Sequence, residues 1–234
     1  MLVKELREQV LEANLDLVRK GLVVATFGNA SGVARAEGLI VIKPSGVPYD
    51  NMKPSDLVVT DMAGKVVEGT LRPSSDLPTH ALLYRSFPQI GGVSHTHSEY
   101  ATAWAQACLP IPCFGTTHAD HFHGPVPVTK RLSQEEIDGD YEGNTGAAIV
   151  RAFKKLDPVA MPAVLVANHA PFCWGPDAAT ASENAWMLEM IARTAFLTLT
   201  IKADAKAISR TLLDRHFLRK HGKSAYYGQP GGKK

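Results

Sequence analysis

Ile90-Gly-Gly-Val-Ser-His-Thr-His-Ser98 is the stretch that decides how this chain folds and what chemistry it carries. The apolar run before His95 indicates a β-strand, and residues 99–107 have the apolar spacing of a helix. Because side chains alternate along a strand, His95 and His97 face the same way and offer two imidazole nitrogens to one metal ion. The pair therefore stands at the carboxyl end of a strand, where α/β proteins place ligands.

A second histidine pair competes for this assignment. His121 and His123 have the same spacing, and His118 lies close to them in sequence. We favour His95 and His97 because a predicted strand precedes them and a predicted helix follows. A metal site in the second cluster remains the alternative.

Composition limits the class of protein. The chain has 234 residues, of which 45% are hydrophobic and 21% charged, which is ordinary for a globular domain. Lysine and arginine (25) nearly balance aspartate and glutamate (23), so we expect no nucleic acid or membrane partner. We see no membrane-spanning run or signal peptide and expect a cytoplasmic protein. We predict one catalytic domain over residues 1–229 and a disordered tail over residues 230–234.

The pattern along the chain predicts short strands interspersed with helices. The predicted helices cover residues 3–20, 79–87, 99–107, 145–156, 177–202 and 208–221, with a capping box at residues 133–136. The predicted strands cover residues 22–26, 39–42, 57–68 with a hairpin turn at 61–64, 90–94 and 163–167, with an interrupted strand pair within 111–129. This irregular order, with its hairpin turn, indicates an α/β fold: a three-layer α/β/α sandwich with a largely antiparallel central sheet.

Three loops of small polar residues follow or precede these elements. They are Gly28-Asn-Ala-Ser31, Lys43-Pro-Ser-Gly46 and Pro73-Ser-Ser-Asp76, the last at a predicted helix start. Hydroxyls, backbone N–H groups and one lysine are what a phosphate group requires. Each loop alone also reads as an ordinary turn, and it is their recurrence that indicates a phosphate site. A fourth loop, at residues 116–120, is predicted to be functional.

Two further residues stand at element ends and can complete a metal site. His169 follows the predicted strand at 163–167, and Asp76 precedes a helix. Together with His95 and His97 they form a ligand set of three histidines and one aspartate, which suits zinc. The alternative is that His169 and Asp76 only cap a strand and a helix.

Six motifs occur together and in order: KPSG at 43–46, PSSD at 73–76, HTHS at 95–98, GTTHAD at 115–120, H-x-PF-x-WG at 169–175 and RKHG-x-x-AYYGQ at 219–229. With them the chain resembles the class II aldolase/adducin family, and within it the branch of L-ribulose-5-phosphate 4-epimerases. The resemblance runs from the first helix to Gln229. It implies a homotetramer with active sites between subunits and one catalytic zinc ion per subunit.

The resemblance also implies a role for individual residues. The implied zinc ligands are Asp76, His95, His97 and His169, and the implied phosphate ligands are Asn29, Lys43, Ser45, Gly46, Ser74 and Ser75. Asp120 and Tyr227 are implied as catalytic acid and base. Thr116, Glu142 and His216 are implied to line or support the site, some of them from the adjoining subunit.

The implied reaction interconverts L-ribulose 5-phosphate and D-xylulose 5-phosphate by cleaving and re-forming the C3–C4 bond. The alternatives are a class II sugar-phosphate aldolase and a non-catalytic, adducin-like binding module. Four positions depart from the epimerase pattern: Phe27, His121, His123 and Ala170. Ala170 matters most, because it replaces a glycine beside His169, where the backbone angle could be closed to alanine.

Overall fold

The structure is a computed structural model that describes residues 1–222 and 225–227, so the predicted tail at 230–234 lies outside the described residues. Its strands are β1 (Asn29–Ala34), β2 (Leu39–Ile42), β3 (Val58–Asp61), β4 (Val66–Glu68), β5 (Gly92–His95), β6 (Ala163–Leu165) and β7 (Pro171–Gly175). Its helices are α1 (Lys4–Arg19), the 3-10 helix η1 (Pro54–Asp56), α2 (Leu77–Ser86), α3 (Glu99–Gln106), α4 (Thr116–Ala119), α5 (Gln134–Asp138), α6 (Tyr141–Ala152), α7 (Ala178–Ile201) and α8 (Arg210–His221).

The strands form one sheet in the order β4-β3-β2-β1-β5-β7-β6, and every pair of neighbours is antiparallel. The predicted antiparallel sheet is therefore confirmed, as is the hairpin of β3 and β4. β5 lies inside the sheet between β1 and β7, with His95 opposite Asn29 on one side and Phe172 on the other.

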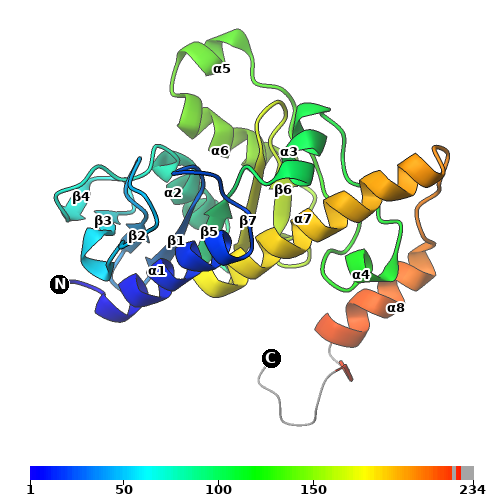
Figure 1. Cartoon of the computed structure of the whole chain (residues 1–234), viewed down its shortest axis with the longest axis horizontal. Helices are drawn as coiled ribbons and strands as arrows, with labels where there is room; N and C mark the ends of the chain where they lie inside the picture. The colour runs from blue at the N-terminus through cyan, green and yellow to red at the C-terminus, as the bar shows by residue number, and fades with distance from the viewer. Residues whose placement is uncertain (223–224, 228–234) are drawn as a thin grey trace.

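Helices cover both faces of the sheet (Figure 1). α1 and α7 pack together on one face, where Gly32 of β1 leaves room for side chains of α1 and Gly92 of β5 approaches the start of α7. A Cβ at Gly92 would lie 2.3 Å from backbone atoms of Asp177, so only glycine allows this contact. On the opposite face, Ser31 of β1 bonds to His80 of α2, and α6 packs against α2. The predicted three layers are present.

The alternation along β5 decides which way its histidine points. Ser94 donates to the carbonyl of Ala181 in α7, so His95 lies on the opposite face of the sheet, the one that carries α2. There its ring stacks on Phe172 of β7 at a centroid distance of 4.1 Å.

Two predictions at the start of the sheet were wrong. Residues 22–26, predicted as a strand, form an irregular segment in which Ala25 has a φ of 53° and Phe27 turns back to bond Val24. Residues 29–31 of the predicted loop at 28–31 are instead the beginning of β1. Its small polar residues are buried because α1 and α2 approach the strand closely from its two faces, and not because the chain turns there.

Other differences are local. The predicted functional loop at 116–120 is the one-turn helix α4, and the predicted strand pair within 111–129 is reduced to a single bridge between Ile111 and Val126. β7 was not predicted as a strand, although it contains the motif that begins at His169. None of the helices in the described part of the chain has the length and apolar character needed to cross a membrane.

Candidate metal and phosphate site

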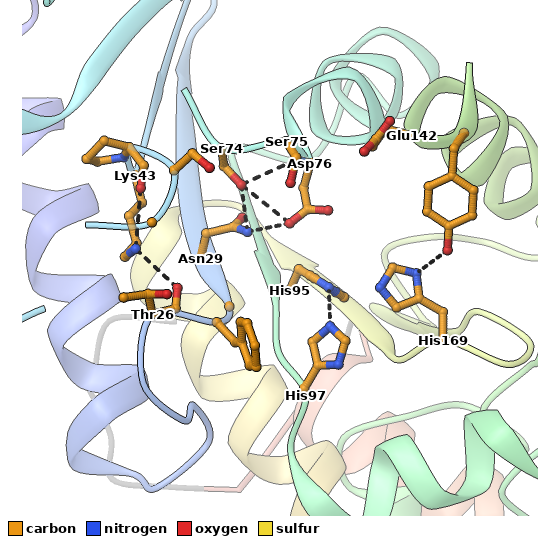
Figure 2. A pocket seen from close by; sticks show the side chains of 16 residues that line it. Thr26, Asn29, Lys43, Ser74, Ser75, Asp76, His95, His97, Glu142 and His169 are labelled. Carbon is orange, nitrogen blue, oxygen red and sulfur yellow. Dashed lines mark hydrogen bonds between the residues drawn. The ribbon is translucent and has the colours of Figure 1, made fainter. Parts of the chain in front are cut away.

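A cleft of about 400 Å³ opens at the ends of β1, β2 and β5 and beside the first turns of α2 and α6. Figure 2 shows its two chemically different ends, with Lys43 at one and His169 at the other. Most of the residues implicated by the sequence line it: Asn29, Lys43, Ser45, Gly46, Ser74, Ser75, Asp76, His95, His97, Glu142 and His169.

Three imidazoles converge at one end of the cleft (Figure 2). The ligand nitrogens of His95, His97 and His169 lie within 4.8 Å of one another, and Nε2 of His95 is 3.1 Å from Nε2 of His97. Tetrahedral zinc with Zn–N bonds of about 2.1 Å places its ligands about 3.4 Å apart, so this spacing fits a metal ion of that size. The cluster can therefore hold a metal ion.

Burial keeps the rings available as neutral ligands. The pKa of His169 is lowered to about 4, first by burial and then by the neighbouring His95 and His97. The pKa of His97 is lowered by burial and by His95. A metal needs neutral imidazoles, so these shifts favour metal binding at neutral pH.

Asp76 lines the same cleft but stands outside the compact group of three nitrogens. Its carboxylate accepts a hydrogen bond of 2.6 Å from Asn29, and Ser74 lies 3.4 Å away. Burial acts to raise its pKa, but His95, His80 and the Asn29 hydrogen bond outweigh burial, and the pKa is lowered. Asp76 is thus a carboxylate beside the imidazoles. Its side chain makes no helix-capping bond, so the capping alternative is wrong for Asp76.

Lys43 forms the other end of the cleft. It is only 1% exposed, and its ammonium group donates to the carbonyls of Thr26 and Pro44 at 3.4 and 3.3 Å and lies over the ring of Tyr49. Burial lowers its pKa to about 8. Among the described residues no carboxylate pairs with it, so an anion in the cleft would supply the missing charge partner.

The segments that carry Lys43 and the paired serines are held together by their backbones. Ser45 N–H donates to the Arg72 carbonyl, and Ser74 N–H donates to the Lys43 carbonyl. These two amides are occupied, whereas the N–H groups of Gly46 and Ser75, which also line the cleft, have no acceptor among the described residues. The groups left for an anion are therefore the Gly46 and Ser75 amides, the Lys43 ammonium and the hydroxyls of Ser45, Ser74 and Ser75. The loops thus offer both side chains and backbone N–H groups to an anion.

The remaining site residues gather elsewhere, around α4 and α8 (Figure 1). Asp120, at the end of α4, bonds to His216 and Arg219 of α8, and the ring of Tyr227 lies against Arg219. Tyr227 is 60% exposed, and Thr116 is exposed at the start of α4. None of Thr116, Asp120, His216 and Tyr227 is among the described residues that line the cleft.

The second histidine cluster does not converge. His118 bonds to the Gly124 carbonyl, and His123 pairs with Asp214 of α8 at 2.6 Å. In the part of the chain that the structure describes, the group of three or more candidate metal ligands is the one with His95. The preference for His95 and His97 over the second pair is supported.

One residue of the site was not predicted from the sequence. Tyr141 lines the cleft, with its hydroxyl 3.2 Å from Nδ1 of His169. Tyr141 directly precedes Glu142, which was already implied as a site residue, and this neighbour in the sequence could have indicated it. The concern about Ala170 does not apply, because the left-handed residue in this turn is Asn168, with a φ of 62°, a conformation that asparagine tolerates.

Comparison with known proteins agrees with this fold. Residues 8–196 match the model of the class II aldolase and adducin N-terminal domain. An L-fuculose 1-phosphate aldolase superposes with a TM-score of 0.78 at 24% identity, covering 92% of this chain and 96% of its own. YgbL from Klebsiella pneumoniae, described as an aldolase, epimerase or decarboxylase, superposes with a TM-score of 0.71 at 25% identity, covering 92% and 99%.

Proposed function

The chain belongs to the class II aldolase and adducin family, and from that premise we propose that it is a zinc-dependent L-ribulose-5-phosphate 4-epimerase. One observation carries the proposal: the same cleft holds a buried lysine, which pairs with no carboxylate of the described residues, and a cluster of three imidazoles. A phosphorylated sugar has a dianionic end and oxygens several carbons away, which matches a site with these two ends.

The reaction must invert C4 of a 2-ketose phosphate. The C4 hydrogen is not acidic, because the C2 carbonyl is not adjacent, so simple proton abstraction is excluded. Removal of the C4 hydroxyl proton allows the C3–C4 bond to break, which gives glycolaldehyde phosphate and the enediolate of dihydroxyacetone. When the aldehyde presents its other face, the bond re-forms, and protonation of the new oxygen gives the other epimer.

Different residues of the chain bind the phosphate group and the metal ion in this reaction. Lys43, the backbone amide of Gly46 and the hydroxyls of Ser45, Ser74 and Ser75 hold the phosphate group. Asn29 bonds to Asp76 and so links the phosphate end to the metal end. Zinc held by His95, His97, His169 and Asp76 would supply positive charge next to the oxygens that become negative as the bond breaks.

The proton-transfer groups come from a neighbouring subunit in this proposal. Asp120 and Tyr227 lie near α8, away from the cleft of their own chain, with Thr116 and His216 close by. A homotetramer in which this region faces the cleft of the next subunit would complete each site. Glu142, which lines the cleft of its own chain, would face the incoming residues.

An aldolase is the second candidate, because several structural neighbours carry that name. Asp76 argues against it, since the aldolase branch typically has glutamate at this position. A non-catalytic, adducin-like module is opposed by the metal-binding group of three histidines.

Product analysis separates these functions. The protein, loaded with zinc, is incubated with L-ribulose 5-phosphate, and the sugar phosphates are followed over time. We expect D-xylulose 5-phosphate to accumulate until it reaches equilibrium with the substrate. Accumulation of dihydroxyacetone and glycolaldehyde phosphate would identify an aldolase, and an unchanged substrate would reject the epimerase.

A further inference from the structure

The three imidazoles of the metal-binding cluster are not held equally firmly. His95 lies in the sheet, and its Nδ1 donates to the backbone carbonyl of Pro171 at 2.9 Å. Because the carbonyl accepts, the proton is on Nδ1, and Nε2 is free for a metal. Pro171 belongs to β7, which pairs with β5, so the sheet itself orients this ligand.

His169 has no such support from the sheet. It lies in the turn between β6 and β7, after Asn168 in the left-handed conformation. One of its ring nitrogens faces His95 and His97 (Figure 2), and the other, Nδ1, lies 3.2 Å from the hydroxyl of Tyr141. The rings of Tyr141 and His169 are nearly parallel, with an angle of 28° between their planes.

We propose that Tyr141 is a positioning residue for the metal ligand His169. Its phenol oxygen accepts the Nδ1 hydrogen, which leaves Nε2 unprotonated and aimed at His95 and His97. The inference rests on the proposed metal site and adds a residue that acts on it through His169. Partners of this kind commonly change metal affinity about 10- to 100-fold.

Tyr141 can do this because its own helix is fixed. It is the first residue of α6, whose start is capped by Asp140, with a bond of 3.1 Å to the Gly143 amide. The backbone carbonyl of Glu142, the residue after Tyr141, accepts a hydrogen bond of 2.6 Å from the hydroxyl of Thr79 in α2. A helix tied down in this way gives the hydroxyl a defined place from which to orient a ring on a turn.

The test measures zinc affinity without any turnover. Metal-free wild type and Tyr141→Phe are titrated with zinc in competition with a chromophoric chelator, and with Co²⁺ while its visible absorption is recorded. Tyr141→Phe keeps the ring and removes only the hydroxyl. We expect its zinc Kd to rise about 10- to 100-fold and its Co²⁺ spectrum to change. The thermal midpoint of the metal-free protein should stay the same.

Tyr100→Phe is the matched control, since Tyr100 is also partly buried but packs against Phe196 of α7. Its zinc Kd should equal that of the wild type. If Tyr141→Phe binds zinc within twofold of the wild type, the role of Tyr141 is overturned and the metal site stands. If the wild type itself binds neither zinc nor Co²⁺, both the metal site and the role of Tyr141 are overturned.

Discussion

Arg219 holds Asp120 with two hydrogen bonds, from Nε to Oδ1 at 3.0 Å and from Nη2 to Oδ2 at 2.7 Å. His216 adds a third contact of 3.1 Å to Oδ1. Although burial acts to raise the pKa of Asp120, these partners outweigh it and hold the pKa below its usual range. Asp120 is therefore a carboxylate at neutral pH, with α8 packed beside it.

Asp120→Asn should lower kcat about 100-fold or more, because it removes the group proposed to transfer a proton. Zinc content should stay at one ion per chain, since Asp120 lies away from the metal-binding cluster. Both are measured on the purified variant, by epimerase assay and by metal analysis. A variant that has lost its zinc would point to a structural role.

Mixed oligomers test whether the site is shared between subunits. Neither His97→Asn nor Asp120→Asn should be active alone. In hetero-oligomers, some sites combine an intact metal-binding cluster with an intact Asp120, so activity should return. Its absence in hetero-oligomers verified by native mass spectrometry would place the whole site within one chain.

Tyr227→Phe should reduce kcat strongly without changing zinc content or oligomeric state, because only the hydroxyl is removed. Arg219 and Lys220 lie against its ring and leave it 60% exposed, so it is available to a neighbouring subunit. Tyr226→Phe, at a residue 67% exposed, is the matched control and should turn over almost normally. Equal rates for the two variants would reduce Tyr227 to a packing residue.

His97→Asn should abolish both zinc binding and activity, whereas His121→Asn should keep one zinc ion per chain. His97 belongs to the converging group of nitrogens and His121 does not. Metal content is measured after dialysis against a chelator and reloading with zinc. The reverse result would move the metal to the second histidine cluster.

Lys43→Met should weaken binding of the substrate about 10- to 100-fold, the usual loss for a charged hydrogen bond to phosphate. Because the pKa of Lys43 is about 8 in the free protein, its charge is present below that pH and is lost above it. KM of the wild type should accordingly rise as the pH passes 8, while kcat changes less. Lys65→Met, at an exposed lysine, should leave KM unchanged.

The metal-free protein should lose stability as the pH falls from about 6.5 toward 4. Burial lowers the pKa of His80 to about 3 and contributes most to lowering those of His118 and His169 to about 4. These rings stay neutral in the folded state but take up protons on unfolding below pH 6.5. Each then removes about 1.4 kcal/mol of unfolding free energy per pH unit. Urea unfolding at pH 7 and pH 5 measures how the free energy of unfolding depends on pH. Equal free energies at the two pH values would contradict the prediction.

The sequence by itself determined the antiparallel sheet, the long helices and the pairing of His95 with His97. Each of these depends on a local period: alternation places the histidine pair, and helical spacing marks residues such as those of α7. The same local reasoning failed at 29–31, the start of β1. Ser31 and the adjoining Gly32 are small because they fit against α2 and α1, which are distant in sequence.

Only the tertiary structure decided which groups share a site. It brought His169 from a turn to His95, left Lys43 without a carboxylate partner among the described residues, and set the Tyr141 hydroxyl beside His169. It also separated Asp120 and Tyr227 from the cleft. Distances between segments far apart in sequence are fixed by packing of the sheet and helices, and no local pattern encodes them.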